Sequence, residues 1–244
     1  MIVNKDKAAV YGARRKKFEL SADQIKTLEL HFPYYVGLSE ENKKIFRKRL
    51  AFFMAHKRFV GMHNLDLFDS MKALICAELI KITFGLKYFF LPHFKVIVIY
   101  PAEYYSNVSR GYHKGEVNLK GSITLAWTSF KEGIADRKDS LNVAIHEFSH
   151  AVYFENFIKN RNYLFINPVL INKMKELGAI EMERIRHNPN HFIRSYGATN
   201  FQEFFAVSTE AFFEQPNVFR RQLPELYKLM TLIYNQDPSR NEYG

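Results

Sequence analysis

The stretch NVAIHEFSHAVYFEN, residues 142–156, constrains the fold more than any other part of the chain. Its apolar residues predict a buried helix, on which His146 and His150 lie one turn apart on the same face. Both imidazoles can therefore point at one metal ion, and Glu147, rotated by about 100°, can reach a water on that ion. Alternatively, the two histidines are merely packed or hydrogen-bonded, although burying two unpaired imidazoles beside a carboxylate is costly. The stretch predicts a zinc site with Glu147 as general base.

A catalytic zinc site needs a third protein ligand and an open position. Tyr153 and Asn156 stand where the form HExxHxxGxxH has its glycine and third histidine, so that class is excluded. A downstream carboxylate must then complete the site. The candidates are Glu176, Glu181, Glu183, Glu203 and Glu210.

Glu203 is the favoured third ligand because it begins an apolar helix, where an isolated carboxylate needs a reason to be present. The alternative is a capping box, in which Asn200 is the N-cap residue and Glu203 occupies position N3. Glu210, seven residues later on the same face, either accepts a hydrogen bond that orients a histidine or is an ordinary surface acid. The other three candidates stand among lysines and arginines, and we expect them to be solvated.

Tyr196 lies seven residues before Glu203, in the loop that would bring Glu203 to the site. A phenol there could donate a hydrogen bond to the oxyanion of a tetrahedral intermediate. The alternative is a packing role, which is more common for a tyrosine between a loop and a helix.

The pattern of apolar residues predicts an α+β protein, mostly helical with a small mixed sheet, in one domain over residues 1–244. We expect a loose basic tail over residues 1–17, a helical part over 18–90 and a catalytic part over 91–244. Ser21 and Gln24 form a capping-box pattern before the first helix, and Asp139 or Ser140 is the expected cap of the helix with His146. Helices are expected over 22–32, 40–59, 67–86, from 139 or 140 to 158, over 167–186 and twice more after 191, and strands within 93–105 and 116–127.

The net charge of +10 could indicate an acidic partner, but its distribution argues against nucleic acid. Much of the excess lies at residues 14–17 and 43–49, and the second run reads as the solvated face of a helix whose Ile45, Phe46 and Leu50 turn inward. The single cysteine, Cys76, is expected to be a buried small hydrophobe and fits a reducing compartment such as the cytoplasm. No apolar run approaches the roughly 18 residues needed to cross a bilayer, so we expect a soluble chain.

With these segments in place, the chain resembles the Mlc titration factor A family of zinc-dependent peptidases. VAIHEFSHAVYFEN and SYGATNFQEFFAVSTEAFFEQP carry the resemblance, supported by RFVGMHNLDLFDSMKALICAEL, VIVIYPAEYY, GSITLAW and LPELYKLMTLIYNQDP in the same order, so that it covers about residues 33 to 238. The local pattern YxxTNxxEFFA is also similar to lethal-factor-type zinc proteases. The resemblance implies a zincin-like fold, zinc bound by His146, His150 and Glu203, Glu147 as base, and Tyr196 as support for the transition state.

The resemblance also implies an edge strand that aligns an extended peptide substrate. GSITLAW is the strand nominated here, with Thr124 and Ala126 as candidate substrate contacts; alternatively it is a core strand ending in Trp127. One departure is Tyr153, since family members often carry an acid three residues after the second histidine. Glu155 and Glu210 are the candidates to take its place.

Two functions of different classes follow. The first is a zinc metallopeptidase acting on a peptide or protein substrate, with the aminopeptidase-like preference that the resemblance implies. The second is a regulatory binding protein that sequesters a transcriptional repressor, with weak or no peptidase activity. Binding of nucleic acid, suggested only by the charge, is a distant third.

Overall fold

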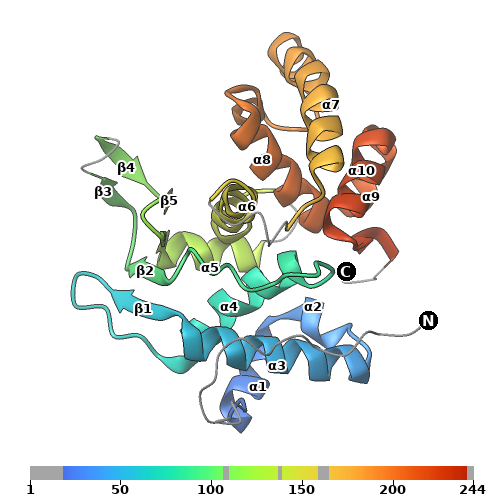
Figure 1. The fold of residues 1–244 in the computed structure, drawn as a ribbon. Coiled ribbons are helices and arrows are strands. Elements are labelled where there is room, and N and C mark those ends of the chain that lie inside the picture. Colours follow the sequence, from blue (N-terminus) through green and yellow to red (C-terminus); the bar gives the residue numbers. More distant parts are fainter. Residues whose placement is uncertain (1–18, 107–109, 137–138, 159–164, 241–244) are drawn as a thin grey trace.

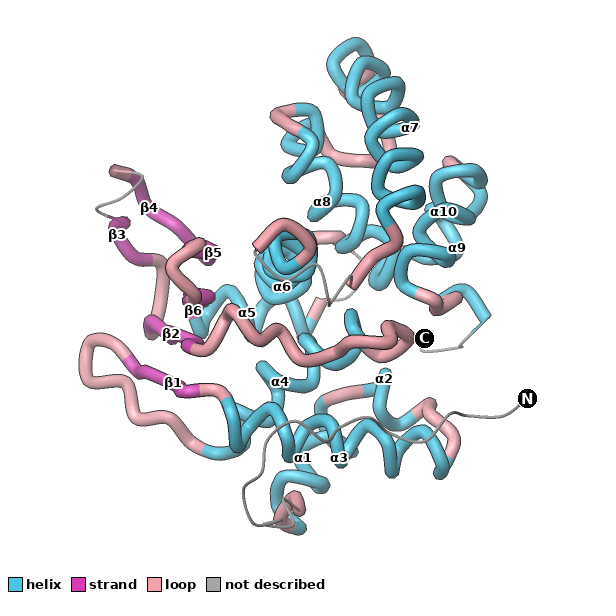
Figure 2. The backbone as a smooth tube through the Cα atoms, viewed as in Figure 1, coloured by secondary structure: helices cyan, strands magenta, loops and turns pink. Residues whose placement is uncertain are grey.

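The computed structural model describes residues 19–106, 110–136, 139–158 and 165–240 (Figure 1). The basic tail predicted over residues 1–17 lies outside these residues. The described chain is mostly helical with a small mixed sheet, which agrees with the α+β prediction (Figure 2). No helix in these ranges is long and apolar enough to cross a membrane.

Helices form the N-terminal part, and the predicted capping box starts the first of them. The Ser21 hydroxyl accepts a hydrogen bond from the Gln24 amide, and the Gln24 side chain accepts one from the Ser21 amide. These helices are α1 (Ala22–His31), α2 (Pro33–Val36), α3 (Glu40–His56) and α4 (Asp69–Thr83).

The buried face of α3 differs from the prediction by one residue. Phe46 and Leu50 are fully buried, as predicted, but Ile45 is 39% exposed. Phe53 completes the buried stripe, because positions 46, 50 and 53 follow the helical spacing of four and three residues and position 45 does not.

A four-stranded sheet has the order β1 (Arg58–Gly61), β2 (Val96–Tyr100), β6 (Ser122–Ala126) and β5 (Gly115–Asn118). The pairs β1–β2 and β2–β6 are parallel, and β5 is antiparallel to β6. The prediction that α3 continues to residue 59 is wrong, because the helix ends at His56 and β1 begins two residues later. This strand is too short to show an alternating pattern in the sequence, and its pairing with β2 defines it. Strands β3 (Tyr104–Ser106) and β4 (Gly111–His113) form a separate hairpin.

The helix with the two histidines, α6 (Val143–Glu155), begins two to three residues later than predicted. Its N-cap is Asn142, whose Oδ1 accepts hydrogen bonds from two backbone amides at 3.1 Å. The predicted cap at Asp139 or Ser140 is wrong, since Asp139 accepts a hydrogen bond from the Leu141 amide before the helix begins. The structure also adds α5 (Trp127–Ala135), which follows β6 directly and was not expected from the sequence.

The C-terminal part contains three α-helices after the polar loop, where two were predicted. Pro216 and Pro224 each occupy the first turn of a new helix, a position that proline tolerates although it would break a helix interior. The elements are α7 (Pro168–His187), the 3₁₀-helix η1 (Ser195–Ala198), α8 (Phe201–Glu214), α9 (Pro216–Gln222), α10 (Pro224–Tyr234) and the 3₁₀-helix η2 (Pro238–Arg240).

Helix α6 lies in the middle of the molecule, between the sheet and the C-terminal helices (Figure 1). It contacts β5 and β6 on one side and α4 and α8 on others. Buried apolar residues of all these parts form one cluster, which includes Leu50, Ile99, Phe148 and Phe204. Cys76 belongs to this cluster, as predicted, and burial raises the pKa of its thiol to about 12.

Candidate metal centre

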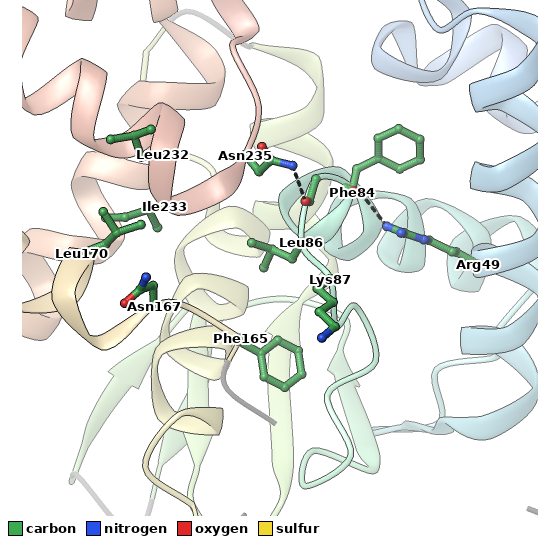
Figure 3. Close-up of a pocket in the computed structure, with 11 residues that line it drawn as sticks. Arg49, Phe84, Leu86, Lys87, Phe165, Asn167, Leu170, Leu232, Ile233 and Asn235 are labelled. Atoms are coloured by element: carbon green, nitrogen blue, oxygen red, sulfur yellow. Dashed lines mark hydrogen bonds between the residues drawn. The ribbon is translucent and has the colours of Figure 1, made fainter. Parts of the chain in front are cut away.

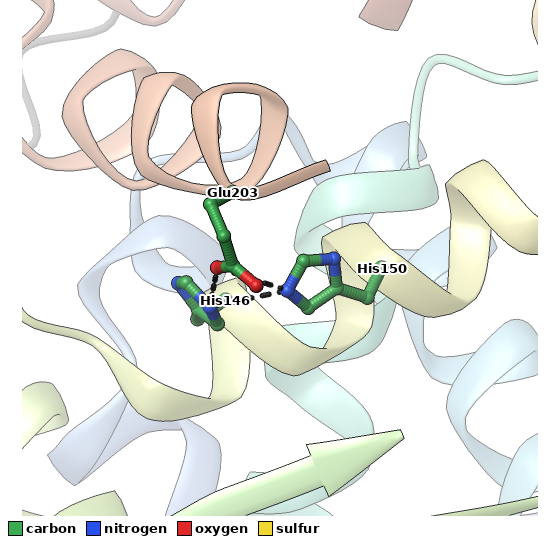
Figure 4. A group of neighbouring side chains, drawn as sticks. All are labelled: His146, His150 and Glu203. Carbon is green, nitrogen blue, oxygen red and sulfur yellow. Dashed lines mark hydrogen bonds and ion pairs between the residues drawn. The ribbon is translucent and has the colours of Figure 1, made fainter. Parts of the chain in front are cut away.

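His146 and His150 project from one face of α6 toward the start of α8 (Figure 4). Their Nε2 atoms lie 3.2 Å apart. Glu203, in the first turn of α8, points its carboxylate at both rings, with Oε2 at 3.1 Å from His146 Nε2 and 3.4 Å from His150 Nε2. The structure thus brings together the three side chains for which the sequence predicts a metal-binding role, from two helices that pack against each other.

This triangle has the dimensions of a metal site. In a tetrahedral zinc site with ligand distances of about 2.0 to 2.2 Å, neighbouring ligand atoms lie about 3.4 Å apart. Glu203 Oε2 is also buried without a hydrogen bond of good geometry from the described residues, although two imidazole nitrogens are close to it. Two nitrogens and one carboxylate oxygen form a donor set that suits zinc. The residues present therefore fit a divalent cation.

The two roles that the sequence allows for Glu203, in the helix cap and as a metal ligand, involve different atoms and are compatible. Its backbone amide donates to Asn200 Oδ1 at 3.0 Å, so Asn200 caps α8. Its carboxylate is left free for the histidines. Burial alone would raise the pKa of Glu203, but the two imidazoles outweigh burial and hold it well below its usual range.

Glu210 lies two turns along α8 and is 1% exposed, so it is no surface acid. Its Oε1 accepts a hydrogen bond from His146 Nδ1 at 2.8 Å and its Oε2 accepts one from the Asn142 amide at 2.9 Å. The Arg194 guanidinium also donates to Oε1. A carboxylate on Nδ1 keeps the proton there and turns Nε2 toward the position of an ion.

The electrostatics of His146 favour positive charge at this point. Burial lowers the pKa of His146, but the adjacent carboxylates of Glu203 and Glu210 outweigh burial and raise the pKa to about 10. A bound cation would gain from the same two carboxylates in place of the Nε2 proton.

Glu147 is buried beside β5, on the sheet side of α6. A Cβ atom added to Gly115 of β5 would lie only 2.6 Å from Glu147 Cγ and 2.7 Å from its Oε1, so this glycine makes room for the carboxylate. Burial raises the pKa of Glu147 to about 8, and Glu203, Glu210 and Glu116 add to the rise, while His146 opposes it. The carboxylate can therefore take up a proton near neutral pH.

Tyr196 is 49% exposed, and its ring centroid lies 5.9 Å from that of His146. Burial of part of the ring raises the pKa of its phenol, and the negative charges of Glu203 and Glu147 raise the pKa further. The hydroxyl thus remains a hydrogen-bond donor at the rim of the metal centre.

The nomination of β6 as a substrate-binding edge is wrong. Strand β6, with Thr124 and Ala126, is hydrogen-bonded to β2 on one side and to β5 on the other. The sheet edges are β1 and β5, and β5 is the one that contacts α6. Periodicity identified the strand but could not reveal its neighbours.

Tyr153, which stands in place of the family acid, packs among the aromatic rings of α6 and α8 and is 6% exposed. Nearby, His150 Nδ1 is buried and has no hydrogen-bonding partner among the described residues. Glu155 does not supply one, because its Oε1 accepts a hydrogen bond from the His93 amide instead. Of the two residues suggested to replace the family acid, only Glu210 lies at the centre, and its hydrogen bond is with His146.

The remaining candidate ligands lie on α7. Glu176 and Glu183 are exposed, as predicted. Glu181 is not solvated as expected: it is 8% exposed and pairs with Arg184 and His191. Its partner His191 lies ten residues further along the chain, so the helical pattern of α7 does not predict this contact.

Three residues around the centre were not predicted from the sequence, namely Asn142, Arg194 and Gly115. An asparagine directly before an apolar run is a capping signal that could have found Asn142. Arg194 and Gly115 act through contacts with distant parts of the chain and leave no such local signal.

A pocket of about 400 Å³ lies apart from these residues, between the ends of α4, α7 and α10 (Figure 3). Its walls include Phe165, Leu170 and Ile233. Its polar groups are largely engaged with the backbone, since Arg49 donates to the Phe84 carbonyl and Asn235 to that of Gly85. The metal centre, and not this pocket, gathers the reactive groups.

Two histidines and a glutamate from adjacent helices, with a buried carboxylate beside them, could form a metal centre of the kind used by metallopeptidases. A family model described as glucose-regulated metallo-peptidase M90 matches residues 7–235. The chain belongs to this family of metallopeptidases.

Similar proteins come from several bacteria. Mlc titration factor A of Escherichia coli (strain 55989 / EAEC) is 25% identical over 236 residues, which cover 86% of this chain and 84% of that protein. Mlc titration factor A of Salmonella arizonae is 26% identical over 244 residues, covering 90% and 94%. An uncharacterized protein of Synechocystis sp. is 24% identical over 229 residues, covering 86% and 82%. The resemblance read from the sequence is confirmed.

Proposed function

We propose that the protein is a zinc-dependent peptidase in which His146, His150 and Glu203 hold the ion. The observation that carries the proposal is the triangle of ligand atoms, with edges of 3.1 to 3.4 Å, beside a buried carboxylate. Bound zinc would supply Lewis acidity, polarising a carbonyl and lowering the pKa of water.

The chain's own residues supply the other parts of the mechanism. The Glu147 carboxylate accepts a proton from the attacking water and passes it to the amine nitrogen as the C–N bond breaks. The Tyr196 hydroxyl donates a hydrogen bond to the oxyanion. The β5 edge, next to Glu147, binds the substrate backbone as an added strand, in the role first assigned to β6.

The finer assignments belong to the same proposal. We infer a zincin-like fold from the His-bearing helix beside a mixed sheet with an edge strand, and a single domain from the shared core. The buried lone cysteine fits a cytoplasmic protein. The aminopeptidase-like preference rests on the family resemblance, and comparing cleavage of free and N-acetylated peptides would test it.

The Glu147→Gln variant tests the mechanism. Glutamine keeps the shape of the side chain but cannot take up the proton, so we expect zinc content equal to that of wild type and cleavage of a peptide library reduced at least 10³-fold, on the order expected for loss of a general base. The same substitution at exposed Glu176 is the control and should change neither. Wild-type turnover by Glu147→Gln would refute the mechanism.

A second candidate is binding of a transcriptional repressor, supported by the name Mlc titration factor A of two relatives. Sequestration does not need chemistry at Glu147. The Glu147→Gln variant should therefore retain the repressor in a pull-down, whereas failure of the wild-type protein to retain Mlc would exclude this candidate.

A further inference from the structure

The buried Glu210 carboxylate contacts a positively charged side chain, Arg194, that has no role in the mechanism above. It accepts hydrogen bonds from His146, from the Asn142 amide and from Arg194. Among these donors only the Arg194 guanidinium carries a permanent positive charge. The guanidinium therefore offsets part of the cost of burying this carboxylate, whose residue is 1% exposed.

Arg194 also begins the turn that carries Tyr196. It is the N-cap residue of η1, and its carbonyl accepts a hydrogen bond from the Gly197 amide at 3.0 Å. Its side chain crosses to α8, while its backbone leads directly into the segment whose tyrosine lies next to His146. One residue thus joins the tyrosine-bearing turn to the support of a metal ligand.

We propose that Arg194 is a positioning residue, which holds the Glu210 carboxylate in place against His146 and fixes the turn with Tyr196 to the metal centre. This inference rests on the proposed metal centre. Without the guanidinium, the buried Glu210 side chain would lose its hydrogen-bonding partner on the side of η1, would turn toward water, and would no longer orient the His146 ring.

The competing explanation is that Arg194 only anchors η1. A matched control separates the two roles, because Arg186 of α7 also anchors η1: its Nη2 donates to the Ala198 carbonyl at 3.1 Å. The carboxylate that Arg186 pairs with is Glu183, away from the centre. Loss of Arg186 therefore loosens the turn and leaves the Glu210 pair in place.

The experiment compares wild type with Arg194→Met, Arg194→Lys and Arg186→Met. Zinc affinity is measured by competition with a chelator, and the visible spectrum of the Co²⁺-loaded protein reports ligand geometry. We expect Arg194→Met to bind zinc about 10- to 100-fold more weakly, as is usual when the partner of a ligand is lost, with an altered Co²⁺ spectrum. Arg194→Lys, which keeps the charge, should recover part of the affinity. Arg186→Met should stay within about threefold of wild type on the same scale.

Wild-type zinc affinity in Arg194→Met, or an equal loss in Arg186→Met, would overturn the proposal. Should Arg194→Met fail to fold, the substitution is repeated in a Glu210→Gln background, where no carboxylate needs the charge. There it should fold and weaken zinc binding by less than about threefold, and a further tenfold loss would contradict the proposed role. A wild-type protein that binds zinc and cleaves peptides, with Arg194→Met unaffected, refutes this inference alone; a wild type that binds no zinc refutes the metal centre too.

Discussion

Glu203 contributes to two interactions through different atoms. Its amide donates to the Asn200 side chain, and its carboxylate lies against the two histidines. A capping box would direct the carboxylate back to the Asn200 amide, but the structure directs it toward α6 (Figure 4). The cap and the metal site can therefore be separated by mutation.

Glu203→Ala should remove a metal ligand and keep the cap. We expect zinc occupancy to fall, with the free energy of unfolding of the metal-free protein changed by less than about 1 kcal/mol, because the amide remains. Asn200→Ala should do the reverse, costing about 1 kcal/mol while zinc affinity is largely retained. Elemental analysis and denaturant unfolding measure the two effects, and a fully metallated Glu203→Ala would mean that another ligand completes the site.

Burial of Lys57 is expected to make the stability of the protein depend on pH. It is 6% exposed, its ammonium donates to the Leu91 and Phe94 carbonyls, and burial lowers its pKa to about 7. The unfolded chain keeps a lysine pKa of about 10.4, so between pH 7 and 10 the unfolded state binds more protons. Stability should therefore rise with pH through this window.

The comparison that isolates Lys57 is with Lys57→Met, which shares every other titrating group. The stability of wild type relative to the variant should increase by roughly 2 to 4 kcal/mol from pH 7 to pH 10, and stay constant below pH 7. Denaturant unfolding at several pH values measures it. A difference that does not change with pH would show that Lys57 keeps an ordinary pKa.

At the scale of elements, the long periodic helices were predictable and the contact-dependent ones were not. Helices α1, α4 and α7 begin within about two residues of their expected starts, because caps and helical spacing are local. Strand β1 has four residues, and pairing with β2 defines it. Whether β5 or β6 forms the edge depends equally on partners far along the chain.

The candidate site divides along the same line. The spacing of His146 and His150 is a property of one helix, so sequence alone predicts that they share a face. Among the candidate third ligands, Glu203 could be singled out because its sequence neighbours are apolar. Arg194 could not, because its significance lies in a contact with Glu210 sixteen residues away, across a 3₁₀ turn and a new helix.

The contact between β5 and α6 yields an element-level prediction. Gly115→Ala places a methyl group within 2.6 to 2.8 Å of Glu147 and Val143, so either the base moves or the strand shifts. We expect kcat for peptide cleavage to fall at least tenfold and stability to fall by about 1 to 3 kcal/mol. Zinc affinity should change little, since no ligand touches the added methyl.

Gly111→Ala in β4 is the matched control, because the nearest atom to its new Cβ lies at an ordinary 3.5 Å. It should leave kcat and stability close to those of wild type. Unchanged turnover in Gly115→Ala would indicate that Glu147 tolerates displacement, and would count against its role as the positioned base.

At the scale of the whole molecule, the candidate metal centre lies where the parts of the chain meet. His146 and His150 belong to the central helix, which contacts the sheet and α4, whereas Glu203 and Glu210 belong to α8 of the C-terminal bundle. An ion bound by both helices would link the C-terminal bundle to the rest of the core. Its free energy of binding would then add to the stability of the fold.

Metal removal should therefore lower the thermal stability of the whole protein. With zinc at about 1,000 times its dissociation constant, binding contributes about 4 kcal/mol, which for a chain of this size corresponds to a rise in Tm of roughly 8 to 16 °C. Calorimetry of zinc-loaded and chelator-treated protein measures the shift, and Glu203→Ala should show a much smaller one at the same zinc concentration. If the loaded and metal-free proteins unfold at the same temperature while zinc is bound, the ion does not join α6 to α8, because a ligand held by both helices must stabilise the packed state over the separated one.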